Sequence, residues 1–111
     1  MRRSLGAGVS GVVTYLVRDA VAIIEIDHPP LNALSPPIRR DLDAALARAE
    51  ADDDVGAVVL RGRGRSFGSG TDPAASVTGS VAGRTAPGLQ AICGRIDAFP
   101  KPVIAAVHGT V

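Results

Sequence analysis

The chain has 111 residues, 46% of them hydrophobic, which is enough for one small domain or for part of a larger one. A net charge of +1 lacks the basic excess typical of a dedicated nucleic-acid binder. The single cysteine excludes an internal disulfide and any multi-cysteine metal site, and it fits a cytoplasmic location.

Residues 1–11 contain two arginines, with glycines and serines but without the apolar stretch of a targeting peptide. We expect a flexible N-terminus here and a domain over residues 12–111. Residues 12–18 and 21–26 are rich in β-branched side chains and predict two successive strands or a hairpin. No apolar run reaches the roughly 18 residues of a membrane span, so no membrane partner is expected.

A proline-rich loop and a helix follow. Four prolines in "DHPPLNALSPP" exclude regular structure. Ser35 as N-cap and Pro36 at the first helical position predict where the helix starts. Apolar residues then recur on one helical face, whereas several charged residues lie off that face. The apolar set is Ile38, Leu42, Ala45, Leu46 and Ala49, and the charged set is Arg39, Arg40, Asp43 and Arg48.

The second half predicts a strand over 57–62, a glycine-rich loop, a helix over about 88–98 and a strand over 102–107. In this helix Leu89, Ile92, Cys93 and Ile96 form the apolar side, so Cys93 is interpreted as a small core residue. Strands that alternate with helices indicate an α/β fold with some parallel pairing. The chain ends just after a buried-looking strand, and we expect it to be the front part of a longer fold.

The stretch "RGRGRSFGSGTDP", residues 61–73, is the main candidate site. It has no lysine for a Walker loop, it misses the dinucleotide fingerprint by one position, and it is too compressed for a nucleophile elbow. A triad of Ser66, Asp72 and His108 is a set that any chain of this length contains by chance. The loop's remaining property is its glycines, which let backbone N–H groups approach a ligand. With Asp72 as cap and Pro73 opening a helical turn, such N–H groups stabilise a negative oxygen.

The charged and titratable residues near this loop have plainer interpretations. Arg61, Arg63 and Arg65 alternate as on one strand face, which favours a solvated edge over an anion site. His28 and His108 lack metal-ligand partners and fit surface or hydrogen-bonded loop positions, so no metal site is predicted.

Three segments together resemble the N-terminal part of the crotonase superfamily, the enoyl-CoA hydratase/isomerase fold. They are "AIIEIDHPPLNALSPPIRRDLDAAL", "AEADDDVGAVVLRGRGRSFGSGTDP" and "LQAICGRIDAFPKPVIAAVHG", in the family's order. The resemblance is closest to the hydratase portion of bacterial fatty-acid oxidation enzymes. It implies an α/β fold of the crotonase-like ββα spiral type, present here as an incomplete N-terminal half.

The resemblance also implies residue roles. The backbone N–H of Thr71 corresponds to one donor of the family's oxyanion hole, which holds the thioester oxygen of an acyl-CoA as it becomes an enolate. Positions that line the CoA channel correspond to Asn32, Ala33, Leu34, Ser69, Gly70 and Asp72. The implied reaction is hydration of 2-trans-enoyl-CoA to 3-hydroxyacyl-CoA, with no cofactor except the coenzyme A of the substrate. A full-length relative is expected to form a trimer-type homo-oligomer.

Departures from the family pattern leave other functions open. Thr71 is β-branched where the family has alanine, Pro73 removes an N–H, and His28 stands where arginine is frequent. The second oxyanion donor and the acid/base glutamates of hydratases belong to a segment after Val111. The 111-residue chain alone is therefore expected to be inactive. A non-catalytic acyl-CoA-binding remnant is the main alternative, and an arginine-glycine nucleic-acid module is a third.

Overall fold

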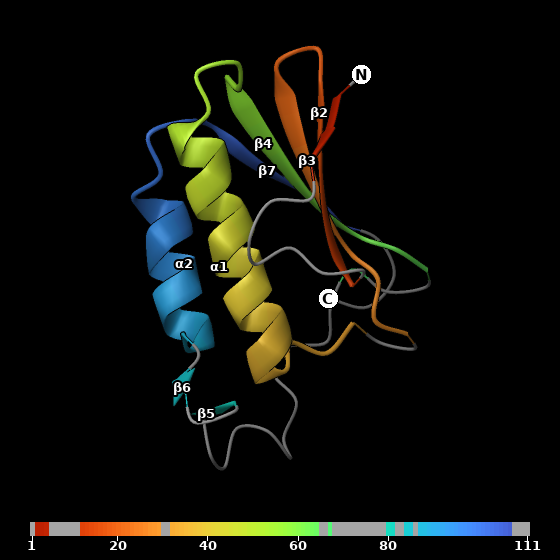
Figure 1. The fold of residues 1–111 in the computed structure, drawn as a ribbon, viewed down its shortest axis with the longest axis vertical. Coiled ribbons are helices and arrows are strands. Elements are labelled where there is room, and N and C mark those ends of the chain that lie inside the picture. The colour runs from red at the N-terminus through yellow and green to blue at the C-terminus, as the bar shows by residue number, and fades with distance from the viewer. Residues whose placement is uncertain are drawn as a thin grey trace.

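The computed structural model describes residues 2–4, 12–29, 32–64, 67, 80–81, 84–85 and 87–107. Within these ranges two helices lie against one face of a five-stranded mixed sheet of order β1-β2-β3-β4-β7 (Figure 1). The sheet strands are β1 (Arg2–Ser4), β2 (Val13–Arg18), β3 (Val21–Ile26), β4 (Ala57–Gly62) and β7 (Val103–Ala106). The helices are α1 (Pro36–Ala51) and α2 (Leu89–Asp97), and a small separate hairpin is formed by β5 (Ser80–Val81) and β6 (Arg84–Thr85).

The strands and helices predicted from the sequence are confirmed with small shifts at their ends. Helix α1 begins at Pro36 as expected, with Ser35 at the N-cap position in extended conformation. Three short strands were not expected. Strand β1 lies inside the segment interpreted as a flexible N-terminus, and β5 and β6 lie inside the segment interpreted as a loop.

Pairing in the sheet follows from the connections. Strands β2 and β3 form an antiparallel hairpin whose turn residues, Asp19 and Ala20, both have positive φ, as a tight two-residue turn requires. Strands β3 and β4 are parallel, as are β4 and β7, because α1 and α2 carry the chain back between them. The expected parallel pairing is therefore confirmed.

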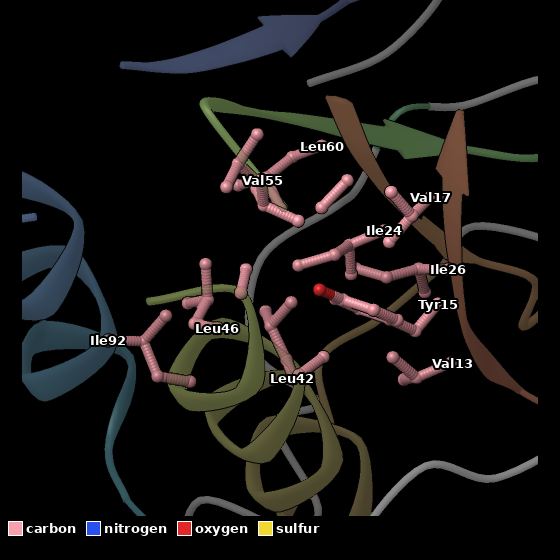
Figure 2. Close-up of a cluster of buried hydrophobic side chains, with 14 of the residues drawn as sticks. Val13, Tyr15, Val17, Ile24, Ile26, Leu42, Leu46, Val55, Leu60 and Ile92 are labelled. Atoms are coloured by element: carbon pink, nitrogen blue, oxygen red, sulfur yellow. The ribbon is translucent and has the colours of Figure 1, made fainter. Parts of the chain in front are cut away.

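The core lies between α1 and the inner face of strands β2, β3 and β4 (Figure 2). Burial alternates along each strand, so that Tyr15 and Ile24 are almost completely buried while their neighbours are half-buried. Leu42 and Leu46 of α1 close the core from the other side. As the composition indicates, aliphatic side chains dominate, and Tyr15 is the aromatic member of this cluster.

Two side chains differ from the sequence prediction. Cys93 is exposed, so its interpretation as a core residue is wrong: Ile92 is the residue through which α2 reaches the core, and Cys93 lies one position round the helix from it. Arg39, predicted to lie off the buried face of its helix, is only 3% exposed. The contacts that hold it are described with the candidate site below.

Candidate functional site

Two loops leave the sheet at the same edge. Ile26, the last residue of β3, is in register with Gly62, the last residue of β4, and the two strands run parallel. The carboxyl ends of parallel neighbours lie side by side, which is where open α/β sheets place their ligands. The proline-rich loop follows β3 and the glycine-rich stretch follows β4. The N–H of Arg63 also donates to the Ile26 carbonyl at 2.8 Å, which continues the pairing beyond the strand ends.

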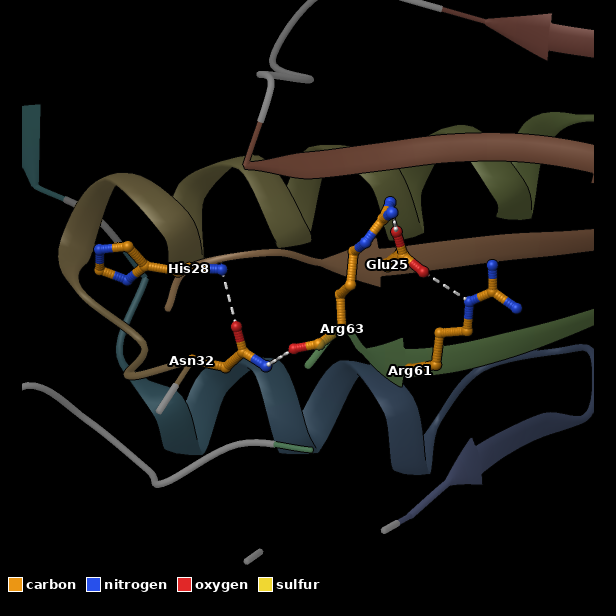
Figure 3. Close-up of polar contacts among 5 residues, drawn as sticks. All are labelled: Glu25, His28, Asn32, Arg61 and Arg63. Carbon is orange, nitrogen blue, oxygen red and sulfur yellow. Dashed lines mark hydrogen bonds and ion pairs between the residues drawn. The ribbon is translucent and has the colours of Figure 1, made fainter. Parts of the chain in front are cut away.

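Asn32 connects these two loops (Figure 3). Its Oδ1 accepts a hydrogen bond from the His28 N–H at 2.7 Å, and its Nδ2 donates to the Arg63 carbonyl at 3.0 Å. The Asn32 N–H donates in turn to the His28 carbonyl at 2.8 Å. The residue is 1% exposed and has a φ of 54°, a left-handed conformation that asparagine tolerates better than most residues. Asn32 therefore shapes its own loop and joins it to the next one.

Buried Arg39 holds the far end of the proline-rich loop. Its Nη1 donates to the Leu34 carbonyl at 2.7 Å and its Nε donates to the Pro87 carbonyl at 2.8 Å. One guanidinium thus ties this loop to the segment that enters α2. Helical periodicity misses this role, because the carbonyls that Arg39 contacts are brought to it only by the tertiary fold.

Two arginines share one carboxylate on the sheet. Arg61 lies 2.8 Å from Glu25 and Arg63 lies 3.7 Å from it (Figure 3). Their side chains remain 48% and 68% exposed, in agreement with a solvated edge. Arg65 lies outside the described residues. At such exposure these pairs contribute little to stability, and they partly neutralise the positive charge beside the loops.

The His28 ring also has a partner inside its loop. Its Nδ1 lies 3.2 Å from the Ala33 carbonyl, which agrees with the interpretation of a hydrogen-bonded loop position. In the part of the chain that the structure describes, no three His, Cys, Asp or Glu side chains gather as a metal site would require.

An apolar cavity of about 270 Å³ lies between the sheet and the two helices. Leu34 of the first loop and Phe67 of the second both line it, so the cavity reaches the loop edge. No carboxylate is among its described lining residues, which are Ile26, Leu34, Leu42, Leu60, Arg61, Phe67, Leu89, Ile92, Cys93, Ile96, Val103 and Ala105. Such a cavity suits an apolar group, and its described lining offers no carboxylate as a general acid or base.

The predicted site residues divide into two groups. Asn32, Ala33 and Leu34 are described and lie in the loop that follows β3, and their role in lining a coenzyme A channel stays a prediction. Ser69, Gly70, Thr71 and Asp72 lie outside the described residues, as does His108, so their roles stay predictions. The strands that these two loops follow, β3 and β4, lie side by side as a parallel pair.

Neither helix in the described ranges has both the length and the apolar content needed to cross a membrane.

Comparison with known proteins agrees with this geometry. Residues 17–111 match the family model described as enoyl-CoA hydratase/isomerase. A Bacillus subtilis protein named "Probable enoyl-CoA hydratase" is 37% identical over 100 residues, which cover 87% of this chain and 39% of that protein. A peroxisomal fatty acid beta-oxidation multifunctional protein of Oryza sativa is 35% identical over 107 residues, covering 93% of this chain and 15% of that protein.

Solved structures show the same relation. A crystal structure of an enoyl-CoA hydratase/isomerase from Xanthobacter autotrophicus Py2 superposes with a TM-score of 0.70 at 34% identity, over 89% of this chain and 39% of that one. The architecture is thus the crotonase-like α/β fold, and the chain spans about two fifths of the length of the Bacillus subtilis and Xanthobacter autotrophicus relatives. With the family model matched over 17–111, the chain belongs to the enoyl-CoA hydratase/isomerase family.

Proposed function

We propose that this protein takes part in the hydration of 2-trans-enoyl-CoA to 3-hydroxyacyl-CoA in fatty-acid β-oxidation. One observation carries the proposal: parallel β3 and β4 deliver two loops to one edge, Asn32 joins these loops, and Leu34 and Phe67 of the same loops line an apolar cavity. A thioester carbonyl placed there would meet backbone N–H donors, and its acyl chain would enter the cavity. Family membership and the names of the relatives support the same substrate class.

The backbone N–H of Thr71 is proposed to hold the thioester oxygen while negative charge develops on it. Donors of this kind act by preorganisation, and removing one from an enzyme costs roughly 10²–10³ in rate. Asn32, Ala33, Leu34, Ser69, Gly70 and Asp72 are proposed to line the path of the coenzyme A. Water adds across a carbon–carbon double bond without any oxidation or reduction, so no cofactor beyond the substrate's coenzyme A is required.

A second candidate, acyl-CoA binding without catalysis, is favoured by the cavity lining. Hydration needs a base to take a proton from water and an acid to protonate the carbon next to the thioester. The described lining holds no carboxylate that could serve in either role. We therefore expect purified 111-residue chain to bind acyl-CoA and to hydrate crotonyl-CoA no faster than buffer does. Turnover well above that of buffer would exclude the binding-only candidate.

The test of the site uses two ligands that differ in one oxygen, acetyl-CoA and its thioether analogue S-ethyl-CoA. Calorimetry should find the thioester bound about threefold to tenfold more tightly, as one or two backbone hydrogen bonds allow. The preference should survive in Thr71→Ala, which keeps the N–H, and disappear in Thr71→Pro, which deletes it. Equal affinity of the unmodified chain for both ligands would refute the oxyanion assignment. So would equal behaviour of the two folded variants.

The proposed function also includes expectations for the protein's cellular location and its oligomeric state. We expect a cytoplasmic protein, and a trimer-type homo-oligomer for a full-length relative. Cell fractionation and sedimentation velocity would test these two expectations separately from the binding assay.

A further inference from the structure

We propose that the Asn32 side chain is a positioning residue that fixes the glycine-rich loop relative to the proline-rich loop. This inference rests on the proposed function, because its consequence is the placement of the Thr71 N–H. The observation behind it is the Asn32–Arg63 hydrogen bond, which joins residues 31 positions apart in the sequence. Figure 3 shows the Asn32 amide between His28 and the Arg63 carbonyl.

The amide group suits this place for chemical reasons. It presents an acceptor to the His28 N–H and a donor to the Arg63 carbonyl from a single planar group. A carboxylate has two acceptors and no donor, so it reproduces only the first bond. Because Asn32 is 1% exposed, water cannot easily replace a missing partner, and each bond matters more than it would at the surface.

The bond acts on the first residue of the second loop. The Arg63 N–H is held by the Ile26 carbonyl and the Arg63 carbonyl is held by Asn32, so the backbone is anchored on both sides of this residue. Gly64 follows with a φ of +90°, a conformation that side-chain-bearing residues rarely adopt. The backbone at Arg63 and Gly64, where the glycine-rich loop begins, is therefore set by Asn32 and by the turn at Gly64. In this view Asn32 makes no contact with the thioester and acts through the loop.

Asn32→Asp separates this role from a general structural one. The variant keeps an oxygen for the His28 N–H and places a second oxygen against the Arg63 carbonyl, so the bond within the loop survives while the bond between the loops is lost. Asn32→Gly accepts the left-handed backbone and removes both side-chain bonds. If the carboxylate variant fails to fold, the glycine variant carries the test. Amide exchange in β2 and β3 reports folding in each case.

The first readout needs no ligand. Hydrogen exchange followed by mass spectrometry should show peptides covering residues 63–72 exchanging about fivefold to tenfold faster in both variants, with peptides of β2 and β3 unchanged. Unchanged exchange over 63–72 in a folded variant would overturn the proposal, whatever the ligands do.

The second readout is the ratio of the S-ethyl-CoA and acetyl-CoA dissociation constants. Both ligands carry the same coenzyme A charges, so the added carboxylate affects them alike and the ratio isolates the thioester oxygen. We expect the ratio to fall to about one in both variants, because changes in affinity that the two ligands share through coenzyme A cancel in it. If the ratio in a variant equals that of the unmodified chain, the positioning role is contradicted, even if the affinities for both ligands have fallen. A ratio of one in the unmodified chain overturns the proposed function instead, while the exchange experiment still decides whether Asn32 joins the loops.

Discussion

The two halves of the sheet have similar apolar patterns and very different burial. Around β2, β3 and α1, residues such as Ile24 and Leu46 are 0% exposed. Around α2 and β7, Ile92 is buried, but Ile104 and Val107 are 56% and 59% exposed and Cys93 faces solvent. Figure 1 shows α1 and α2 lying against the same face of the sheet, whereas Ile104 lies on the opposite face, which neither of these two helices covers.

The difference shows that an apolar pattern determines which side chains lie on the same face of the sheet. How far they are buried depends on the strands beside them and on what packs against that face. Ile23 and Val59 lie in the same cross-strand row as Ile104, on the sheet face opposite to the core, and both are half-buried because strands flank them on either side. Ile104 stands on β7, the last strand in the sheet order, and has a neighbour on one side. We therefore expect substitutions of similar chemistry to have large effects in the first half and small effects in the second.

The largest effect is expected for Ile24→Ala. This side chain lies at the centre of the core, and its loss should lower the free energy of unfolding by about 2–5 kcal/mol, through lost burial and the cavity left behind. Urea denaturation followed by circular dichroism would measure the change. A loss below about 1 kcal/mol would mean that the core around β3 is not close-packed.

Lys101→Met should have the next largest effect, because it breaks one of the links between the two halves. The Lys101 ammonium donates to the carbonyls of Ala49 and Asp52 at 2.8 Å each, at the C-terminal end of α1. A cation at this end of a helix is favourable, and methionine keeps the apolar stem while removing charge and donors. We expect a loss of about 1–2 kcal/mol in the same urea measurement. An unchanged midpoint would show that water replaces the ammonium at no cost.

Arg95→Gln tests the contact between the helices. Arg95 lies 2.7 Å from Asp43 and 3.4 Å from Glu50, and these side chains are roughly one third to one half exposed. Such pairs contribute modestly, so we expect a loss of about 0.5–1 kcal/mol that shrinks as salt is raised from low to molar concentration. An effect that is independent of salt would indicate that packing of the Arg95 stem, and not its charge, joins the helices.

The smallest effect is expected for Ile104→Ala, which makes the same chemical change as Ile24→Ala. With more than half of the side chain already in water, the free energy of unfolding should change by less than about 0.5 kcal/mol. Sedimentation velocity on the same samples should show less self-association, because an exposed apolar strand edge favours it. A loss comparable to that of Ile24→Ala would show that β7 is covered in solution.

Much of the fold could be predicted because its signals are local. The proline at position 36 marks the start of α1, and the β-branched residues of "VAIIEI" mark β3. The candidate loops were also found locally, from glycines and prolines that exclude regular structure. Strands β1, β5 and β6 were missed because each has only two or three residues, too few for a period to be read.

The amino-acid sequence by itself determined the element types, the aliphatic core and the two loops, since these depend on neighbours within a few positions. Only the tertiary structure decided what Asn32 and Arg39 do, because their partners, Arg63 and Pro87, are 31 and 48 positions away. It also decided that Cys93 and Ile104 are exposed, because exposure depends on what packs against a residue, and no periodicity within α2 or β7 records that. Secondary structure is encoded by residues within a few positions of one another. The partner of a buried polar group such as Asn32 is set instead by the parallel pairing of β3 and β4, which brings distant segments to one edge of the sheet.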